Sequence, residues 1–132
     1  MIVYRIEWPE GGGFYNGRSY SFAMSLIDDT NDAIDRHPSP SNDSLFAEDY
    51  RRKLGPLDNA LDLRWAFESL RSLRRWFYND QWIRNIDEAG GLLCTYEVNP
   101  HTTIVGRTQV AFDSKTAKLF YREPLINVLE KV

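Results

Sequence analysis

The stretch LRWAFESLRSLRRWFYNDQWIRNIDEAGGLLCTYEV, residues 63–98, decides the fold, because two strand patterns flank two helix patterns within it. Residues 63–67 alternate in the manner of a strand. Ser69 then begins a helix over 69–78, whose apolar residues recur at the spacing of one helix face. That face holds Leu70, Leu73, Trp76 and Phe77, and the opposite face holds Arg71, Arg74 and Arg75.

A second helix and a second strand follow directly. Asn79-Asp80 caps a helix over 80–89, because such side chains accept hydrogen bonds from the free N–H groups at a helix start. Gly90-Gly91 ends this helix, and the apolar run 92–98 is a strand. The inward face of the helix is predicted at Trp82, Ile83, Ile86 and Ala89.

The rest of the chain adds weaker patterns. Strands are predicted at 2–7 and 118–121, a hairpin at 103–112 around Gly106-Arg107, and short helices at 21–27 and 44–53. We therefore predict one α+β domain over 1–132, with helices packed on a mixed, mainly antiparallel sheet. Its core is predicted at Trp65, Phe67, Leu70, Leu73, Trp76, Phe77, Ile83, Ile86, Leu93, Val110 and Phe112.

Two segments lack a regular pattern. Residues 10–17 contain three successive glycines, but no Lys-Ser/Thr pair and no strand-to-helix context, so a flexible loop is expected rather than a nucleotide site. Residues 36–43 contain Pro38 and Pro40, which exclude both a helix and a sheet ladder. A long loop of this kind within a domain is usually functional or mobile.

The net charge of −3 is unevenly distributed. Residues 1–62 carry 11 acids and 6 bases, whereas residues 63–132 carry 8 acids and 10 bases. This asymmetry indicates either an acidic face for a basic protein partner or a solvated surface. The candidate partner-binding residues are Asp28, Asp29, Asp32, Asp35 and His37.

Several kinds of chemistry are not expected. The single cysteine, Cys94, excludes an intramolecular disulfide and a thiolate metal cluster, and its apolar neighbours favour a buried thiol. His37 and His101 lie too far apart for a recognisable metal motif. The negative net charge makes nucleic acid an unexpected partner. No apolar run is long enough for a transmembrane helix and no signal peptide is expected, so a cytoplasmic location is predicted.

Three short motifs follow the order found in a known fold. They are Val3-Tyr4-Arg5-Ile6, the step Trp65-Ala66-Phe67-Glu68-Ser69-Leu70, and Gly106-Arg107-Thr108-Gln109-Val110-Ala111-Phe112. Together they cover about a fifth of the chain and resemble the ADP-ribosyltransferase fold. Arginine-type members of that family carry an Arg on the first strand, a Ser or Thr at the start of a later segment, and a catalytic Glu on a late strand.

The resemblance implies roles for three residues. Arg5 would hold the phosphate or ribose of NAD, and Ser69 would brace the site. Gln109 would occupy the catalytic position, where the family's Glu stabilises the ribosyl cation. Because an amide carries no negative charge, the rate of ADP-ribosyl transfer would fall by a factor of roughly 10²–10³ or more. Without the resemblance, Arg5 and Gln109 are outward strand residues and Ser69 is a helix cap.

The chain is also similar to small phage-encoded proteins that open with Tyr-Arg-Ile-Glu and carry His-Pro-x-Pro, here residues 4–7 and 37–40. Two functions follow. The first is a non-enzymatic binding or inhibitory protein on an ADP-ribosyltransferase-like scaffold, acting without a cofactor on a host defence protein in the host cytoplasm. The alternative is an active NAD-dependent ADP-ribosyltransferase or NAD glycohydrolase that uses Glu97 or Glu68 in place of Gln109.

Overall fold

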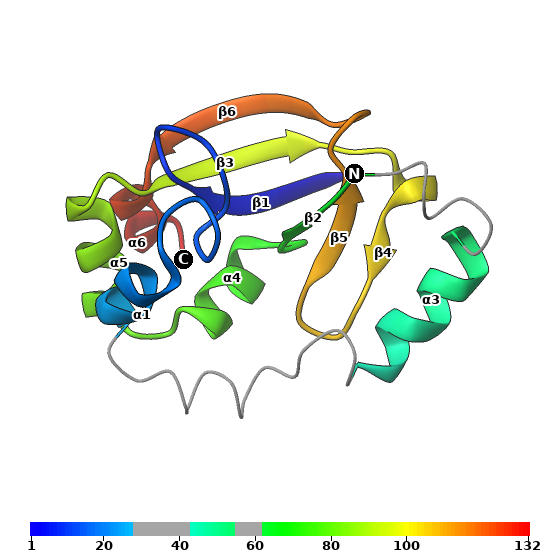
Figure 1. Cartoon of the computed structure of the whole chain (residues 1–132), viewed down its shortest axis with the longest axis horizontal. Helices are drawn as coiled ribbons and strands as arrows, with labels where there is room; N and C mark the ends of the chain where they lie inside the picture. The colour runs from blue at the N-terminus through cyan, green and yellow to red at the C-terminus, as the bar shows by residue number, and fades with distance from the viewer. Residues whose placement is uncertain (28–42, 55–61) are drawn as a thin grey trace.

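The computed structural model describes residues 1–27, 43–54 and 62–132, which form two small antiparallel sheets and five α-helices. Figure 1 shows the sheets side by side, with helices gathered below the first sheet and another helix at the far end of the molecule, beside the second sheet. The predicted α+β class is therefore confirmed. The ADP-ribosyltransferase-like fold is not confirmed.

The first sheet has the strand order β1-β3-β6. Its strands are β1 (Ile2–Glu7), β3 (Leu92–Glu97) and β6 (Lys118–Pro124). Arg5 pairs with Cys94 and Ile6 with Leu93, so these two pairs point to opposite faces of the sheet. The Ile6 face packs against the helices, and β6 runs along the upper margin of the molecule as an edge strand (Figure 1).

The second sheet has the order β2-β5-β4 and abuts the first. Its strands are β2 (Leu63–Ala66), β5 (Val110–Asp113) and β4 (Ile104–Val105). Tyr4 and Phe67 exchange two backbone hydrogen bonds of 2.8 Å. This bridge fixes the end of β2 against β1, and therefore brings residues about 60 positions apart into contact.

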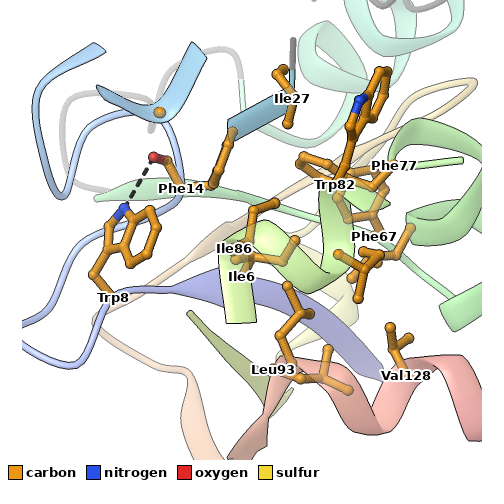
Figure 2. Close-up of a cluster of buried hydrophobic side chains, with 14 residues drawn as sticks. Ile6, Trp8, Phe14, Ile27, Phe67, Phe77, Trp82, Ile86, Leu93 and Val128 are labelled. Carbon is orange, nitrogen blue, oxygen red and sulfur yellow. Dashed lines mark hydrogen bonds between the residues drawn. The ribbon is translucent and has the colours of Figure 1, made fainter. Parts of the chain in front are cut away.

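The main core lies between the first sheet and its helices. These helices are α1 (Tyr20–Ile27), α4 (Leu70–Trp76), α5 (Asp80–Glu88) and α6 (Val128–Lys131). Figure 2 shows Ile6 and Leu93 from the sheet pointing toward Ile86 and Val128 from the helices. The indole N–H of Trp8 donates to the Phe14 carbonyl at 3.1 Å, so this buried ring has its polar group satisfied (Figure 2).

The two central helices begin at the predicted caps. The side chain of Ser69 accepts a hydrogen bond from the Ser72 N–H at 3.0 Å, and that of Asn79 accepts from the Gln81 N–H at 2.8 Å. Leu73, Ile83 and Ile86 are fully buried. The helical periodicity therefore predicted both the position and the inward face of α4 and α5.

A fifth helix, α3 (Ser44–Leu54), packs on the second sheet (Figure 1). Asp43 caps it and also accepts from the Arg107 N–H at 2.7 Å. Asp49 accepts from the Val105 N–H at 2.9 Å, and the Lys53 ammonium donates to the Thr103 carbonyl at 2.9 Å. Three charged side chains thus join α3 to the β4–β5 hairpin.

Three details of the prediction were wrong. The strands pair only in antiparallel fashion within the described residues, in two sheets rather than one mixed sheet. Trp65 is 37% exposed, because it lies on the outer face of β2 against Phe46 of α3, with ring centroids 5.2 Å apart. The hairpin turn is centred on Arg107-Thr108 rather than on Gly106-Arg107, since Val105 pairs with Val110 and the Gly106 N–H bonds the Gln109 carbonyl at 2.9 Å.

Other differences are small. Leu70 and Trp76 are only partly buried, and β6 continues three residues beyond its predicted end. The last residues form a 3-10 turn, Leu125–Asn127, and α6. Within the described residues, no helix is long and apolar enough to cross a membrane.

Candidate functional site

Arg5 lies at the junction of the two sheets and is only 8% exposed. Its Nε donates to Glu7 Oε2 at 3.1 Å, and its Nη1 donates to the Trp65 carbonyl at 2.7 Å. Glu7 is available because residues two apart on a strand point to the same face. The guanidinium therefore neutralises its charge on β1 and joins β1 to β2.

Glu7 has a second partner on the neighbouring strand. Tyr96 of β3 donates its hydroxyl to Glu7 Oε2 at 2.5 Å. Burial, followed by this hydrogen bond, raises the pKa of Tyr96 far above its ordinary value, so the hydroxyl keeps its proton at neutral pH. Glu7 Oε2 thus accepts from both Arg5 and Tyr96.

The glycine-rich segment is pinned against β1 rather than free. The Phe14 N–H donates to the Ile6 carbonyl at 3.1 Å, and Gly13 forms a bridge with Glu7. A Cβ on Gly13 would lie 2.6 Å from Arg5 Nη2. A larger residue at this position would therefore require the guanidinium to shift, and the expectation of a flexible loop was wrong here.

Arg5 and Gln109 line one cleft. Its other walls come from β1, the glycine-rich segment and the aromatic rings of Phe14, Phe67 and Phe77. The cavity volume is about 100 Å³, whereas sites for drug-sized ligands measure roughly 300–1,000 Å³. The cleft is therefore small and largely apolar, with a guanidinium at one wall and an amide at another.

A second cleft also has Arg5 in its wall. It measures about 230 Å³ and is lined in addition by Glu7, Arg64, Tyr96 and Ser114 among others. Arg64 pairs with Asp62 at 3.1 Å, and Ser114 Oγ donates to the same carboxylate at 2.6 Å. Each charged group that lines this cleft therefore has a partner, because Arg5 and Glu7 bond each other and Arg64 bonds Asp62.

Ser69 does not line either cleft. Its hydroxyl caps α4 and lies 3.0 Å from the hydroxyl of Ser72. The structure thus brings together Arg5 and Gln109 of the three residues that the resemblance singled out. Glu68 and Glu97, the alternative acids, are exposed and line neither cleft.

The remaining candidates are placed differently. The partner-binding residues Asp28, Asp29, Asp32, Asp35 and His37 lie outside the described residues. Cys94 is fully buried, as predicted, and burial followed by the charge of Glu7 raises the pKa of its thiol to about 11. Among the described residues no group of three or more His, Cys, Asp or Glu could hold a metal ion.

The partners of Arg5 were missed from sequence. Alternation along β1 was a usable signal for Glu7, because it places Arg5 and Glu7 on one face. Nothing local could indicate Tyr96, which is 89 positions from Glu7 in the chain. Nothing local could indicate Gly13 either, because its contact with Arg5 depends on how the glycine-rich segment folds back over β1.

One comparison with known proteins gives a match. The family model described as bacteriophage T4 Y00F protein matches residues 1–126. The chain is therefore an α+β phage protein, and it belongs to the bacteriophage T4 Y00F protein family. No curated protein and no solved structure matches it.

Proposed function

We propose that this phage protein acts by binding a host protein, without catalysis and without a cofactor, on an ADP-ribosyltransferase-like scaffold. A host defence protein is the partner, and the host cytoplasm is the place of action. Membership of a phage family supports the phage origin. The shared cleft of Arg5 and Gln109 supports the likeness of the scaffold.

The carrying observation is that the described residues lining the cleft with Gln109 include no carboxylate. A ribosyl cation requires negative charge at the catalytic position, where this chain has an amide. Glu7, the nearest acid along β1, is already bonded by Arg5 and Tyr96. The volume of about 100 Å³ is also small for a dinucleotide.

One observation favours the alternative function, an NAD-dependent transferase or glycohydrolase. Arg5 and Gln109 share a cleft, as a cofactor site on that scaffold would require. In this alternative Arg5 and Ser69 would bind the cofactor. Arg5, however, is already hydrogen-bonded to Glu7 and Trp65, and Ser69 caps α4. We therefore favour the binding protein.

Nicotinamide release from NAD separates the two functions. The wild type is expected to release none above the buffer rate, over hours at micromolar enzyme. Gln109→Glu, which adds charge at nearly constant shape, is the sensitised variant. Release by the wild type that is lost in Glu97→Gln or Glu68→Gln, but kept in Gln109→Ala, would establish the enzyme and overturn the binding protein.

A further inference from the structure

The edge strand β6 exposes three successive large apolar residues. Leu119, Phe120 and Tyr121 are 43%, 58% and 57% exposed. Other exposed large hydrophobic residues of the described chain do not occur three in a row. Leu119 lies opposite Tyr96 and Tyr121 opposite Thr95, so their side chains project on opposite faces of the sheet, and the three residues wrap its free edge. Exposed apolar side chains grouped in this way mark interaction sites in many proteins. We call these three residues the β6 ridge.

The ridge is not suited to binding a partner through backbone pairing with β6. Thr95 pairs with Tyr121 and Tyr96 with Leu119, so Phe120 is an extra residue without a partner on β3. Such a bulge, together with Lys118 and Pro124 on the same strand, protects an edge against strand addition. The contact therefore uses side chains, and an added strand, including β6 of a second copy, is disfavoured.

The exposed charged residues of β6 beside the ridge are positive. Lys118 and Arg122 flank it and are both exposed. Glu123, the acid of β6, is buried and lies 3.6 Å from the Lys131 ammonium. Glu97 of β3 is exposed opposite Lys118 and offsets one of the two positive charges. A partner with carboxylates at the border of its apolar surface would therefore be complementary.

We propose that the β6 ridge is the surface through which the chain binds its protein partner, and that the partner presents an apolar pocket bordered by carboxylates. This inference rests on the proposed binding function and adds the location and the partner's chemistry. Aromatic side chains beside cations also suit single-stranded nucleic acid. The net charge of −3 and the presence of Glu97 favour a protein.

The test begins with the immobilised wild type and a lysate of the bacterial host. The retained protein is named by mass spectrometry, purified, and its affinity is measured for each variant over a range of salt. Phe120→Ser removes the centre of the ridge, and Lys118→Gln/Arg122→Gln removes its charges. Tyr20→Ser is the matched control, because Tyr20 is 59% exposed and lies on α1.

Phe120→Ser is expected to weaken binding roughly 30-fold or more, as for an aromatic anchor at an interface. The double Gln variant is expected to bind more weakly and with a flatter salt dependence, while Tyr20→Ser binds like the wild type. Melting temperatures close to the wild type show that each variant is folded.

Other outcomes overturn the inference in distinguishable ways. The retained protein could instead bind the ridge variants as tightly as the wild type but fail to bind the variant Asp28→Asn/Asp29→Asn/Asp32→Asn/Asp35→Asn. That result would place the contact on these four aspartates and leave the proposed function intact. Retention of no host protein by the wild type would remove both proposals. Dimerisation abolished by Phe120→Ser in sedimentation, or binding of a labelled single-stranded oligonucleotide abolished by it, would assign the ridge to a second copy or to nucleic acid.

Discussion

Arg5 and Glu7 point to the same face of β1 and are joined by a contact of 3.1 Å between Nε and Oε2, with both side chains largely buried. The same guanidinium bonds the Trp65 carbonyl, and the same carboxylate accepts from Tyr96. This pair therefore joins three strands, β1, β2 and β3, and lies beside both clefts.

Glu7→Gln should destabilise the protein by about 3 kcal/mol, because it leaves the positive charge of Arg5 buried without its counter-charge. Urea denaturation measures the loss. In the double variant Arg5→Met/Glu7→Gln the cost should be clearly less than the sum of the two single costs. Additive costs would show that the pair contributes nothing as a pair.

Gly13→Ala should cost about 1–3 kcal/mol, the usual range for a forced steric overlap. The added methyl would lie 2.6 Å from Arg5 Nη2, and Arg5 is held in place by Glu7 and Trp65. The same substitution made in an Arg5→Met background should cost less. An equal cost in both backgrounds would mean that Arg5 is not the obstacle.

Leu73→Ala should cost about 2–5 kcal/mol, since Leu73 is fully buried and its removal leaves a cavity. Arg71→Ala, on the exposed face of the same helix, should melt within a few degrees of the wild type. If Arg71→Ala lowered the melting temperature more than Leu73→Ala did, the inward face of α4 would have been assigned wrongly.

Prediction from sequence succeeded where the interactions are between near neighbours in the chain and failed where they are long-range. Caps at Ser69 and Asn79 and the face containing Leu73 depend on neighbours within one or two helical turns, and these predictions were confirmed. The burial of Trp8 and Phe14 was not predicted, because it depends on how the glycine-rich segment folds back over β1.

The candidate site was predictable only in part, for the same reason. Placing Arg5 and Gln109 on one cleft came from a resemblance in motif order, not from any local pattern. Alternation predicted Trp65 and Phe67 on one face, yet Trp65 is 37% exposed, because β2 belongs to a second sheet whose outer face, among the described residues, is covered by α3. Which sheet a short strand joins is set by long-range pairing that the strand itself does not encode.

Stability should fall in acid partly through Asp49. Burial tends to raise the pKa of this carboxyl, but the Val105 N–H, Lys53 and Arg52 together hold it below its ordinary value of 3.8. A lowered pKa in the folded state means that the stabilisation is complete above the unfolded value and is lost as the pH falls through the folded one. Chemical denaturation between pH 7 and pH 2 measures this loss.

Asp49→Asn should therefore cost about 1.5–3 kcal/mol at neutral pH, the usual contribution of hydrogen bonds to a charged group, and less in acid. Glu48→Gln, an exposed neighbour on α3, is the control and should follow the wild type. An Asp49→Asn variant whose loss of stability were the same at pH 2 as at pH 7 would exclude the proposed role of its charge.

The most direct test of the non-catalytic function is an NMR titration of the isotope-labelled chain with NAD, following the side-chain amide of Gln109 and the guanidinium of Arg5. We expect no saturable shift of either signal at millimolar NAD, because the cleft measures about 100 Å³ and Arg5 is bonded to Glu7 and Trp65. Saturable shifts of both signals, absent in Arg5→Met, would show that the cleft binds the cofactor and would contradict a purely protein-binding function.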